Sequence, residues 1–518
     1  MQSTNACAFL AIAARAEQAV IFRQGVSTVG SAFQRRIKLG VIVGSREFFS
    51  PSVALSARGE AIAQFAAIGI DPAILPVDAT ANGAVQSRDD AKLYAKFFRE
   101  HRDEIDGLVV LLPNFGDEIA ILETLRLADL NVPLLLQASN DEIDKVDVRS
   151  RRDAFCGKIS VTNNLYQYGI PFTDTATHTC DVHGDAFRAD LDKFARVCRL
   201  VRGLHKARVG AIGARTGAFQ TMRYSEKLLQ ATGVTVVTVD LSEIIAGASR
   251  ISDDDAAVKA KLAEIFAYGR IPAHIDRGNI VKQAKWSLAV DRWIDENECD
   301  ASSIQCWSSL QNNFGCATCL TMSIMGEKLM PSACEVDVMG AVSMYALALA
   351  SGAPPAILDW NNNYGDAPDM CVCTHCGNFP KSFIGDTPEI SNLDVLGTVL
   401  GQERCFGAVK GKVRAGPMTF FRLSSDDRAG TLKCYVGEGE FTDDPFPMDG
   451  GIAVSRVGRL RDLMGFVTRN GFEHHVAMVR GNHAAVVDEA VNRYLGWPIY
   501  HHRSAPQYTA VSELSFRP

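Results

Sequence analysis

The sequence predicts an α/β protein with two parallel-sheet α/β domains followed by a β-rich, small barrel-like C-terminal domain. In the first 345 residues of the 518-residue chain, short apolar runs alternate with helical patterns. This alternation is typical of parallel sheets covered by helices. From residue 398 onward, short alternating segments are separated by Gly, Asp and Pro, which indicates antiparallel β structure. The length fits about three domains.

The first α/β domain is predicted over residues 37–170. Its strand candidates are short and continuously apolar, as expected for parallel strands buried on both faces. The run at residues 38–44, for example, reads Lys-Leu-Gly-Val-Ile-Val-Gly. The other predicted strands are residues 107–113 and 132–137, and the predicted helices are residues 54–68 and 90–101.

Two further domains follow. The second α/β domain is predicted over residues 171–345, with strands at residues 208–213, 234–239 and 303–307 and a helix at 224–231. The C-terminal domain, residues 346–518, has predicted strands at residues 406–413, 418–423 and 431–438 and a closing helical segment at 484–495.

Residues 1–36 contain four arginines and a single acidic residue, Glu17. That composition fits an organellar targeting segment. It fits equally well a disordered extension or an incorrectly assigned start, and we favour these simpler interpretations. The segment is left out of the fold prediction.

Composition excludes several classes of partner. The net charge is −7 and there is no basic stripe, so no nucleic acid partner is expected. No uninterrupted apolar run reaches the roughly 18 residues that cross a bilayer, so no membrane partner is expected. Many of the 14 cysteines lie in apolar segments, which favours reduced thiols in a cytoplasmic protein over a secreted disulfide framework.

Two acidic residues, Glu335 and Asp359, adjoin apolar runs and are the candidates for catalytic and metal-binding residues. Partial burial of such carboxyls raises their pKa unless a cation or hydrogen bonds offset it. Two carboxylates with one imidazole also form an oxygen-rich site that suits Mn²⁺ or Mg²⁺. The alternative is structural: Glu335 caps a helix and Asp359 begins a turn.

The cysteines of Cys316-Ala-Thr-Cys319 and Cys371-Val-Cys373-Thr-His375-Cys376 raise the alternative of structural zinc. The spacing between Cys371 and Cys373 is too tight for an ordinary C-x₂-C knuckle. We therefore interpret His375 as a ligand of substrate hydroxyls, which polar groups at a sugar site must match.

Five parts of the sequence, in order, resemble the L-fucose/L-arabinose isomerase family. The carboxylates of the third part have the family's spacing. The five parts are residues 43–50, residues 213–219 with 223–227, the segments around Glu335 and Asp359, residues 375–380, and residues 473–481.

The resemblance implies a metal-dependent aldose–ketose isomerase. Glu335, Asp359 and a histidine are then ligands of Mn²⁺, with Mg²⁺ or Co²⁺ as substitutes, and the C-terminal domain completes the metal site. The two carboxylates move a proton between carbons 1 and 2 through an enediol, one accepting and one donating. His474 and His475 would point to opposite faces of a strand. The family pattern selects His475, six residues before Gly481, over His474 and His483.

Further residues are predicted to bind the sugar. The fork of Arg46 suits a sugar oxygen or an anionic group, although a salt bridge is an equal alternative. Trp307 suits stacking on a sugar ring or a place in the core. The other substrate-binding candidates are Phe48, Asn362, His375 and Asn378.

Family resemblance also implies a homo-oligomer, a hexamer or tetramer, with active sites near subunit interfaces, so that Arg46 and Phe48 act on a neighbour's site. The sugar stays open among a 6-deoxyhexose, a pentose and a sulfonated hexose such as sulfoquinovose. Two other functions stay open: a non-catalytic sugar-binding or regulatory protein on the same scaffold, and a metal-dependent epimerase or lyase.

Overall fold

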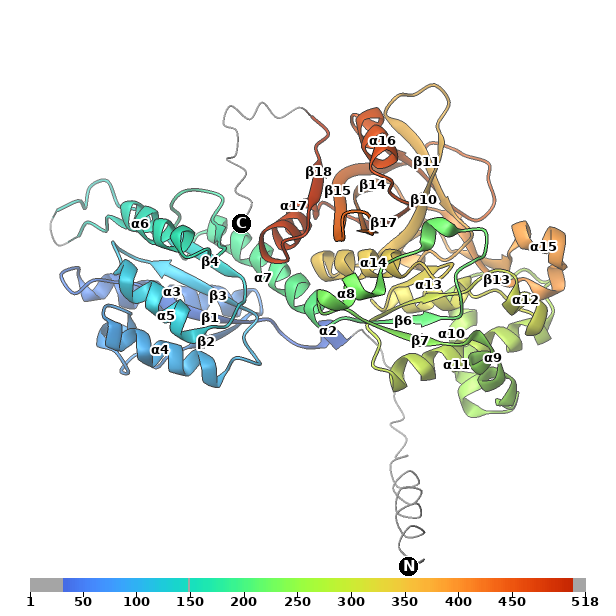
Figure 1. The fold of residues 1–518 in the computed structure, drawn as a ribbon, viewed down its shortest axis with the longest axis horizontal. Helices are drawn as coiled ribbons and strands as arrows, with labels where there is room; N and C mark the ends of the chain where they lie inside the picture. The colour runs from blue at the N-terminus through green and yellow to red at the C-terminus, as the bar shows by residue number, and fades with distance from the viewer. Residues whose placement is uncertain (1–30, 148–149, 506–518) are drawn as a thin grey trace, which may run out of the picture.

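The computed structural model describes residues 31–147 and 150–505, which form two α/β domains with parallel sheets and a β-rich C-terminal domain (Figure 1). The predicted fold class is therefore confirmed. Most of the predicted N-terminal extension, residues 1–30, lies outside the described residues. Among the described residues, no helix combines the length and the apolar character needed to cross a membrane.

The N-terminal domain is a five-stranded parallel sheet with the strand order β2-β1-β3-β4-β5. Its central strand, β3, is buried along its whole length, as the continuous apolar run predicts. The strands are β1 (Lys38–Val43), β2 (Asp71–Ile74), β3 (Gly107–Leu112), β4 (Leu134–Ala138) and β5 (Thr173–Asp174).

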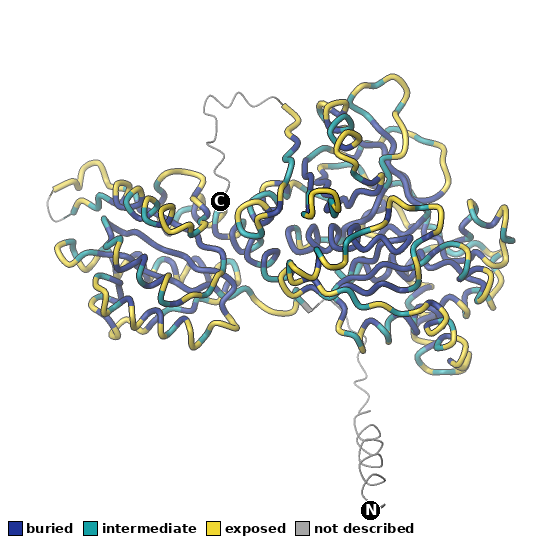
Figure 2. The backbone as a smooth tube through the Cα atoms, in the orientation of Figure 1, coloured by how far each residue is buried: buried dark blue, intermediate teal, exposed yellow. Residues whose placement is uncertain are grey.

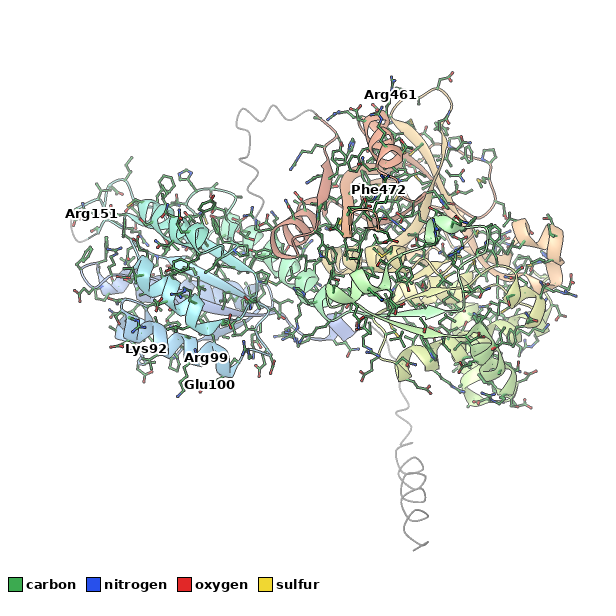
Figure 3. The ribbon with its side chains drawn as sticks, viewed as in Figure 1. Lys92, Arg99, Glu100, Arg151, Arg461 and Phe472 are labelled. Carbon is green, nitrogen blue, oxygen red and sulfur yellow. The ribbon has the colours of Figure 1, made fainter. Side chains whose placement is uncertain are left out.

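Helices cover both faces of this sheet, and an apolar cluster lies on each side. Helix α4 buries Tyr94 and Phe98, whereas Lys92, Arg99 and Glu100 extend from its outer face into solvent (Figure 3). The helices are α3 (Pro51–Ala67), α4 (Arg88–Glu100), α5 (Glu118–Ala128) and α6 (Ala154–Gln167), and α7 (Asp185–His205) leads to the next domain.

The central domain is a four-stranded parallel sheet with the strand order β7-β6-β8-β9. The predicted strand at 303–307 is shifted, because the chain leaves the sheet after Ile304. The strands are β6 (Arg208–Ile212), β7 (Thr235–Val239), β8 (Ala301–Ile304) and β9 (Ser332–Cys334). The longer helices are α9 (Leu241–Arg250), α10 (Ala256–Tyr268), α11 (Arg277–Glu296), α13 (Cys319–Glu327) and α14 (Val338–Ser351).

The C-terminal domain contains a small closed barrel, as predicted. Six strands pair in the order β16-β11-β10-β17-β14-β15, and an additional antiparallel pairing of β15 with β16 closes the ring. Closure leaves no free edge in these strands. The six strands are β10 (Ala356–Asn363), β11 (Met370–His375), β14 (Gly416–Asp426), β15 (Thr431–Thr442), β16 (Gly451–Arg456) and β17 (His475–Arg480). Strands β12 (Glu389–Asn392), β13 (Phe406–Lys412) and β18 (Ile499–His502) extend the sheet outside the ring.

Helix α14 joins the central sheet to the barrel. Residues 338–350 are all buried, and the helix packs against α7 on one side and against β14 and β17 on another. The apolar clusters beside it contain residues of both the central sheet and the barrel, and the tube through these segments is dark blue in Figure 2. The two domains therefore share their core, which fixes the geometry between them.

The remaining elements are short. The predicted helical segment at 484–495 begins as α17 (Ala484–Asp488) and continues as a π-helix, η5 (Glu489–Tyr494). The others are α2 (Ser31–Gln34), η1 (Ala81–Gly83), η2 (Gln220–Met222), α8 (Glu226–Ala231), α12 (Ser309–Asn313), η3 (Lys381–Phe383), α15 (Asp394–Leu400), η4 (Gln402–Arg404) and α16 (Leu460–Arg469).

Candidate functional site

Three chain segments bring Glu335, Asp359 and His475 together at the junction of the central sheet and the barrel. Asp359 on β10 and His475 on β17 are directly opposed partners in antiparallel strands. Glu335 follows β9, at the carboxyl end of the central sheet, where ligands commonly bind in α/β folds. The structural alternatives for these acids do not apply, since Asp359 lies within a strand and Asp337 caps α14.

The backbone holding Glu335 adopts an unusual conformation. Glu335 has φ 61° and Val336 has φ 55°, so two successive residues other than glycine are in the left-handed region. This conformation is a genuine outlier for a β-branched residue. Such strain persists only where the surrounding structure enforces it, and it is concentrated at functional sites.

The three side chains face one another at short range. Nε2 of His475 lies 2.9 Å from Oε2 of Glu335 and 3.5 Å from Oδ1 of Asp359. The Glu335 and His475 side chains are 4% and 1% exposed, whereas that of Asp359 is 26% exposed. The site is therefore buried on one side and open at Asp359.

Several polar atoms at this site have no hydrogen-bond partner, although they are buried. They are Oδ1 of Asp359, Nδ1 of His375 and both amide atoms of Asn378, whereas Oε2 of Glu335 is ion-paired with His475. Ligand atoms of Glu335, His375 and His475 lie within 4.8 Å of one another. Buried polar groups are normally satisfied, so these unpaired atoms indicate a site for an ion or a polar ligand. Carboxylate oxygens with imidazole nitrogens fit a divalent cation.

A buried ionic network supports His475 from behind. Nδ1 of His475 donates to Oδ2 of Asp337 over 2.8 Å. Arg422 binds the same carboxylate through two hydrogen bonds of 2.6 and 3.1 Å and also donates to Glu473 over 3.1 Å. Asp337, Arg422 and Glu473 were not predicted as site residues. Asp337 and Glu473 lie two residues from Glu335 and His475, but nothing in the sequence pairs them with Arg422.

The pKa values in the site follow from these contacts. Burial lowers the pKa of His475, but Asp337 and Glu335 outweigh it and raise that pKa to about 10. Burial raises the pKa of Glu335, but His475 and His375 hold it below its usual range. Burial likewise opposes ionisation of Asp337, yet Arg422 and His475 hold its pKa far below the ordinary value. Both carboxyls are therefore ionised at neutral pH.

The other candidate histidines are placed differently from His475. His474 is 41% exposed at the side chain, and its Nε2 lies 3.8 Å from Oδ1 of Asp359. Its ring contacts Phe219, which in turn contacts Trp307 at 5.1 Å between ring centroids. His483 follows β17, and its Nε2 lies 3.2 Å from the backbone carbonyl oxygen of Arg480.

The predicted sugar-binding residues fall into two groups. His375 and Asn378 are buried beside the carboxylates, and half-buried Trp307 is linked to the mouth of the site through Phe219 and His474. Asn362 is exposed farther along β10, past an irregularity between Trp360 and Asn362, and its side chain accepts a hydrogen bond from the Asn363 backbone.

Arg46 and Phe48 lie in the loop after β1, and the chain does not bring them to the carboxylates. Arg46 donates to the Gly116 carbonyl and lies over the Phe115 ring at 4.4 Å. The side chain of Phe48 is 72% exposed. Figure 1 shows the N-terminal domain well apart from the barrel strands β10 and β17.

Comparison with known families matches both ends of the chain. Residues 40–205 match the fucose/sulfoquinovose isomerase N-terminal domain. Residues 373–502 match the L-fucose isomerase C-terminal domain. The two matches together cover more than half of the chain.

Individual relatives agree with these matches. A sulfoquinovose isomerase from Priestia aryabhattai is 25% identical over 338 residues, which is 64% of this chain and 72% of the relative. A sulfoquinovose isomerase from Alkalicoccus urumqiensis is 26% identical over 325 residues, 61% of this chain and 69% of the relative. A periplasmic sugar-binding protein from Pseudomonas fluorescens aligns at 12% identity over 60% of this chain and 78% of its own, with a TM-score of 0.16, too low to carry an argument.

Proposed function

The chain belongs to the L-fucose isomerase-like family, and we propose that it is a metal-dependent aldose–ketose isomerase with its active site at Glu335, Asp359 and His475. The observation that carries the proposal is the convergence of Oε2 of Glu335, Oδ1 of Asp359 and Nε2 of His475. Oδ1 of Asp359, Nδ1 of His375 and both amide atoms of Asn378 are buried without a hydrogen-bond partner. Such an arrangement is costly unless a bound ion or ligand compensates it.

Glu335, Asp359 and His475 would hold the ion, and the position of His375 supports it as a fourth ligand. Carboxylate and imidazole donors suit Mn²⁺, with Mg²⁺ or Co²⁺ as substitutes. A divalent ion bound there supplies Lewis acidity that polarises a sugar carbonyl. Asp337 accepts the Nδ1 proton of His475, so Nε2 would bind the ion after releasing the proton that the raised pKa of His475 keeps there in the ion-free site.

Proton transfer between carbons 1 and 2 requires one group that accepts a proton and one that donates it. Glu335 is held ionised by its histidine neighbours, so it is ready to accept. Oδ1 of Asp359 lies 3.5 Å from Nε2 of His475, and the Asp359 side chain is 26% exposed, so we assign it the donating role. Their roles reverse with the direction of the reaction.

The substrate we propose is a sulfonated hexose, sulfoquinovose, because the relatives are named for that sugar. Arg46 then provides the positive charge that reads the sulfonate. It reaches the site from a neighbouring subunit, since its own chain holds it on the N-terminal domain. This arrangement requires a homo-oligomer, for which we propose a hexamer.

The test is ketose formation from sulfoquinovose, L-fucose and L-arabinose by the Mn²⁺-loaded protein. We expect sulfoquinovose to be converted with the highest kcat/KM. D359N should lose turnover on every sugar, whereas D366N, which changes an exposed acid in the loop after β10, should match the wild type. Failure of all aldoses to yield ketose would reject the isomerase. Preference for a neutral sugar would reject only the proposed substrate.

A further inference from the structure

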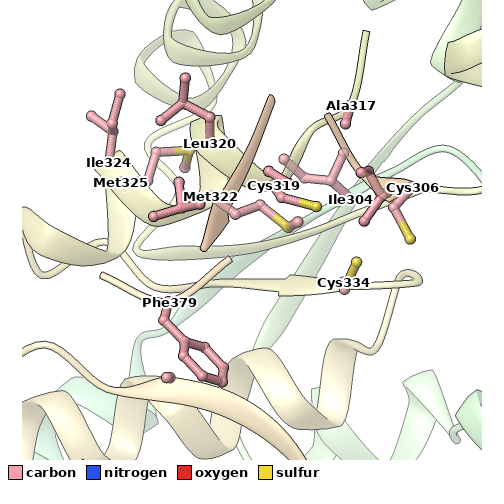
Figure 4. Close-up of a cluster of buried hydrophobic side chains, with 14 of the residues drawn as sticks. Ile304, Cys306, Ala317, Cys319, Leu320, Met322, Ile324, Met325, Cys334 and Phe379 are labelled. Atoms are coloured by element: carbon pink, nitrogen blue, oxygen red, sulfur yellow. The ribbon is translucent and has the colours of Figure 1, made fainter. Parts of the chain in front are cut away.

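A pair of buried thiols adjoins the Glu335 carboxylate on the side of the central sheet. Cys334 is the last residue of β9, and Cys306 lies just beyond β8, the neighbouring strand, where Ile304 is in register with Cys334. One ligand atom from each of Cys306, Cys334 and Glu335 lies within 4.8 Å of the other two. Figure 4 shows the two thiols directed toward the same space, with Cys319 nearby.

This cluster differs in kind from the site around His475. Among the described residues, three groups of side chains are placed closely enough to hold an ion, and this is the group that contains sulfur. The two sulfurs favour soft, thiophilic ions such as Zn²⁺ and Cd²⁺, whereas carboxylates and imidazoles also accept harder ions. Of the cysteines that the sequence pattern first suggested for zinc, Cys371 and Cys373 have sulfurs 3.7 Å apart, but neither is part of such a group among the described residues.

Glu335 belongs to both donor sets. Its carboxylate faces His475 at 2.9 Å and is also within reach of Cys306 and Cys334. A carboxylate that coordinates a second ion loses charge and freedom to accept a proton, because the ion lowers the proton affinity of its ligands. Occupation of the sulfur site therefore affects the chemistry of Glu335 directly.

We propose that Cys306, Cys334 and Glu335 form a second, inhibitory site for a thiophilic divalent ion, which shares Glu335 with the catalytic site. The inhibition rests on the proposed isomerase function, whereas binding to the thiols does not. Binding releases the two thiol protons to solvent, since the ligands of such an ion are thiolates.

The test titrates the Mn²⁺-loaded protein with Cd²⁺ while ultraviolet thiolate-to-cadmium absorption and isomerase turnover are recorded together. Because Cys156 is exposed and Cys7 lies outside the described residues, both are first replaced by serine. C306S and C334S are compared with C434S, which removes an equally buried thiol in β15. The turnover of each variant is expressed relative to its own turnover without Cd²⁺. Thermal unfolding shows whether each variant is folded.

We expect one Cd²⁺ ion to bind per chain. Its binding should produce the ultraviolet absorption of two thiolate ligands and abolish isomerase turnover. In C306S or C334S the apparent affinity for Cd²⁺ should fall at least about tenfold. Replacing a residue that only orients a metal ligand already lowers metal affinity about 10- to 100-fold, and loss of the ligand itself should lower it at least as much. C434S should behave as its parent. Absence of thiolate absorption in the parent, which needs no cysteine variant to fold, would overturn the proposal, as would unchanged Cd²⁺ binding by C306S and C334S.

A third result separates the two proposals. Saturating thiolate absorption with full turnover would overturn the shared use of Glu335. If the parent shows no isomerase turnover at all but binds Cd²⁺ through Cys306 and Cys334, the isomerase proposal fails while the thiol site stands.

Discussion

The two ring nitrogens of His475 contact different partners. Nδ1 is engaged by Asp337, while Nε2 faces both Glu335 and Asp359. The neighbouring His474 precedes β17 and is exposed, but it does not point to the opposite side: ligand atoms of Asp359, His474 and His475 lie within 4.8 Å of one another. The two histidines therefore differ in burial and in the contacts of His475 with Asp337 and Glu335.

Replacing these histidines one at a time tests the assignment of His475 as a metal ligand. H475Q should lower Mn²⁺ affinity by at least about 100-fold. Replacing a residue that only orients a metal ligand lowers metal affinity about 10- to 100-fold, and loss of the ligand itself should have a larger effect. H474Q should retain Mn²⁺ affinity. Isothermal titration of Mn²⁺ into both variants measures this, and equal losses in the two would contradict the assignment.

Asp337 acts through His475 and is a positioning residue. D337N leaves the positive charge of Arg422 buried with Glu473 as its remaining partner. Breaking a buried pair costs about 3–5 kcal/mol of stability, and the loosened His475 should lower Mn²⁺ affinity about 10- to 100-fold.

Thermal unfolding and Mn²⁺ titration of D337N measure the two effects, with D366N as the control. A purely structural role would lower stability alone. Unchanged Mn²⁺ affinity in a destabilised but folded D337N would therefore remove Asp337 from the metal site.

The sequence predicts part of this site and not the rest, for physical reasons. Glu335 and Asp359 are candidates because carboxyls beside apolar runs stand out along the chain, but the family resemblance is what favours them as site residues over structural roles. The Asp337–Arg422 pair could not be predicted, since it joins residues 85 apart that meet only when β14 lies over α14. The thiol pair of Cys306 and Cys334 was missed because register between two parallel strands brings it together.

At the scale of elements, continuous apolar runs predict the buried parallel strands β1, β3, β4 and β6. The short strands β2, β5 and β9 are not predicted. Of the six barrel strands, the sequence predicts β14 and β15, and it predicts β13 outside the ring. It does not predict the closing pair of β15 with β16, which depends on register. It also predicts one helix at 484–495, where the structure changes to the π-helix η5 after Asp488. Tyr494, the last residue of η5, bonds the Leu134 backbone and Thr173 in the first sheet.

Tyr494 therefore fastens the C-terminal segment to the N-terminal domain. Y494F should lower the free energy of unfolding by about 1–3 kcal/mol, the cost of leaving buried polar partners unsatisfied. The control variant Y364F removes an exposed hydrogen bond from the Tyr364 hydroxyl to a backbone carbonyl. It should change the free energy of unfolding by less than about 0.5 kcal/mol. A matching thermal midpoint for Y494F and wild type would show that η5 does not hold the N-terminal domain.

At the scale of the whole molecule, the proposed role of Arg46 requires that a complete active site uses two chains. Mixed oligomers test this. R46Q and D359N should each be nearly inactive on sulfoquinovose, but unfolding and refolding them together should restore part of the turnover, because some sites then combine the intact Arg46 of one chain with the intact Asp359 of another.

Each variant refolded alone is the control for that experiment. Recovery in the mixture but not in the controls is the expected result. An absence of recovery, with mixed oligomers verified by mass, would place Arg46 outside the neighbouring site.

The central claim is that Glu335, Asp359 and His475 hold the ion on which aldose–ketose isomerisation depends. The most direct measurement is ketose formation after divalent ions are removed with EDTA and Mn²⁺ is returned in steps. We expect turnover to disappear with EDTA and to recover in proportion to the Mn²⁺ bound, up to one ion per chain. The D359N variant should not recover turnover when Mn²⁺ is returned. Full turnover of the ion-free protein would contradict the central claim.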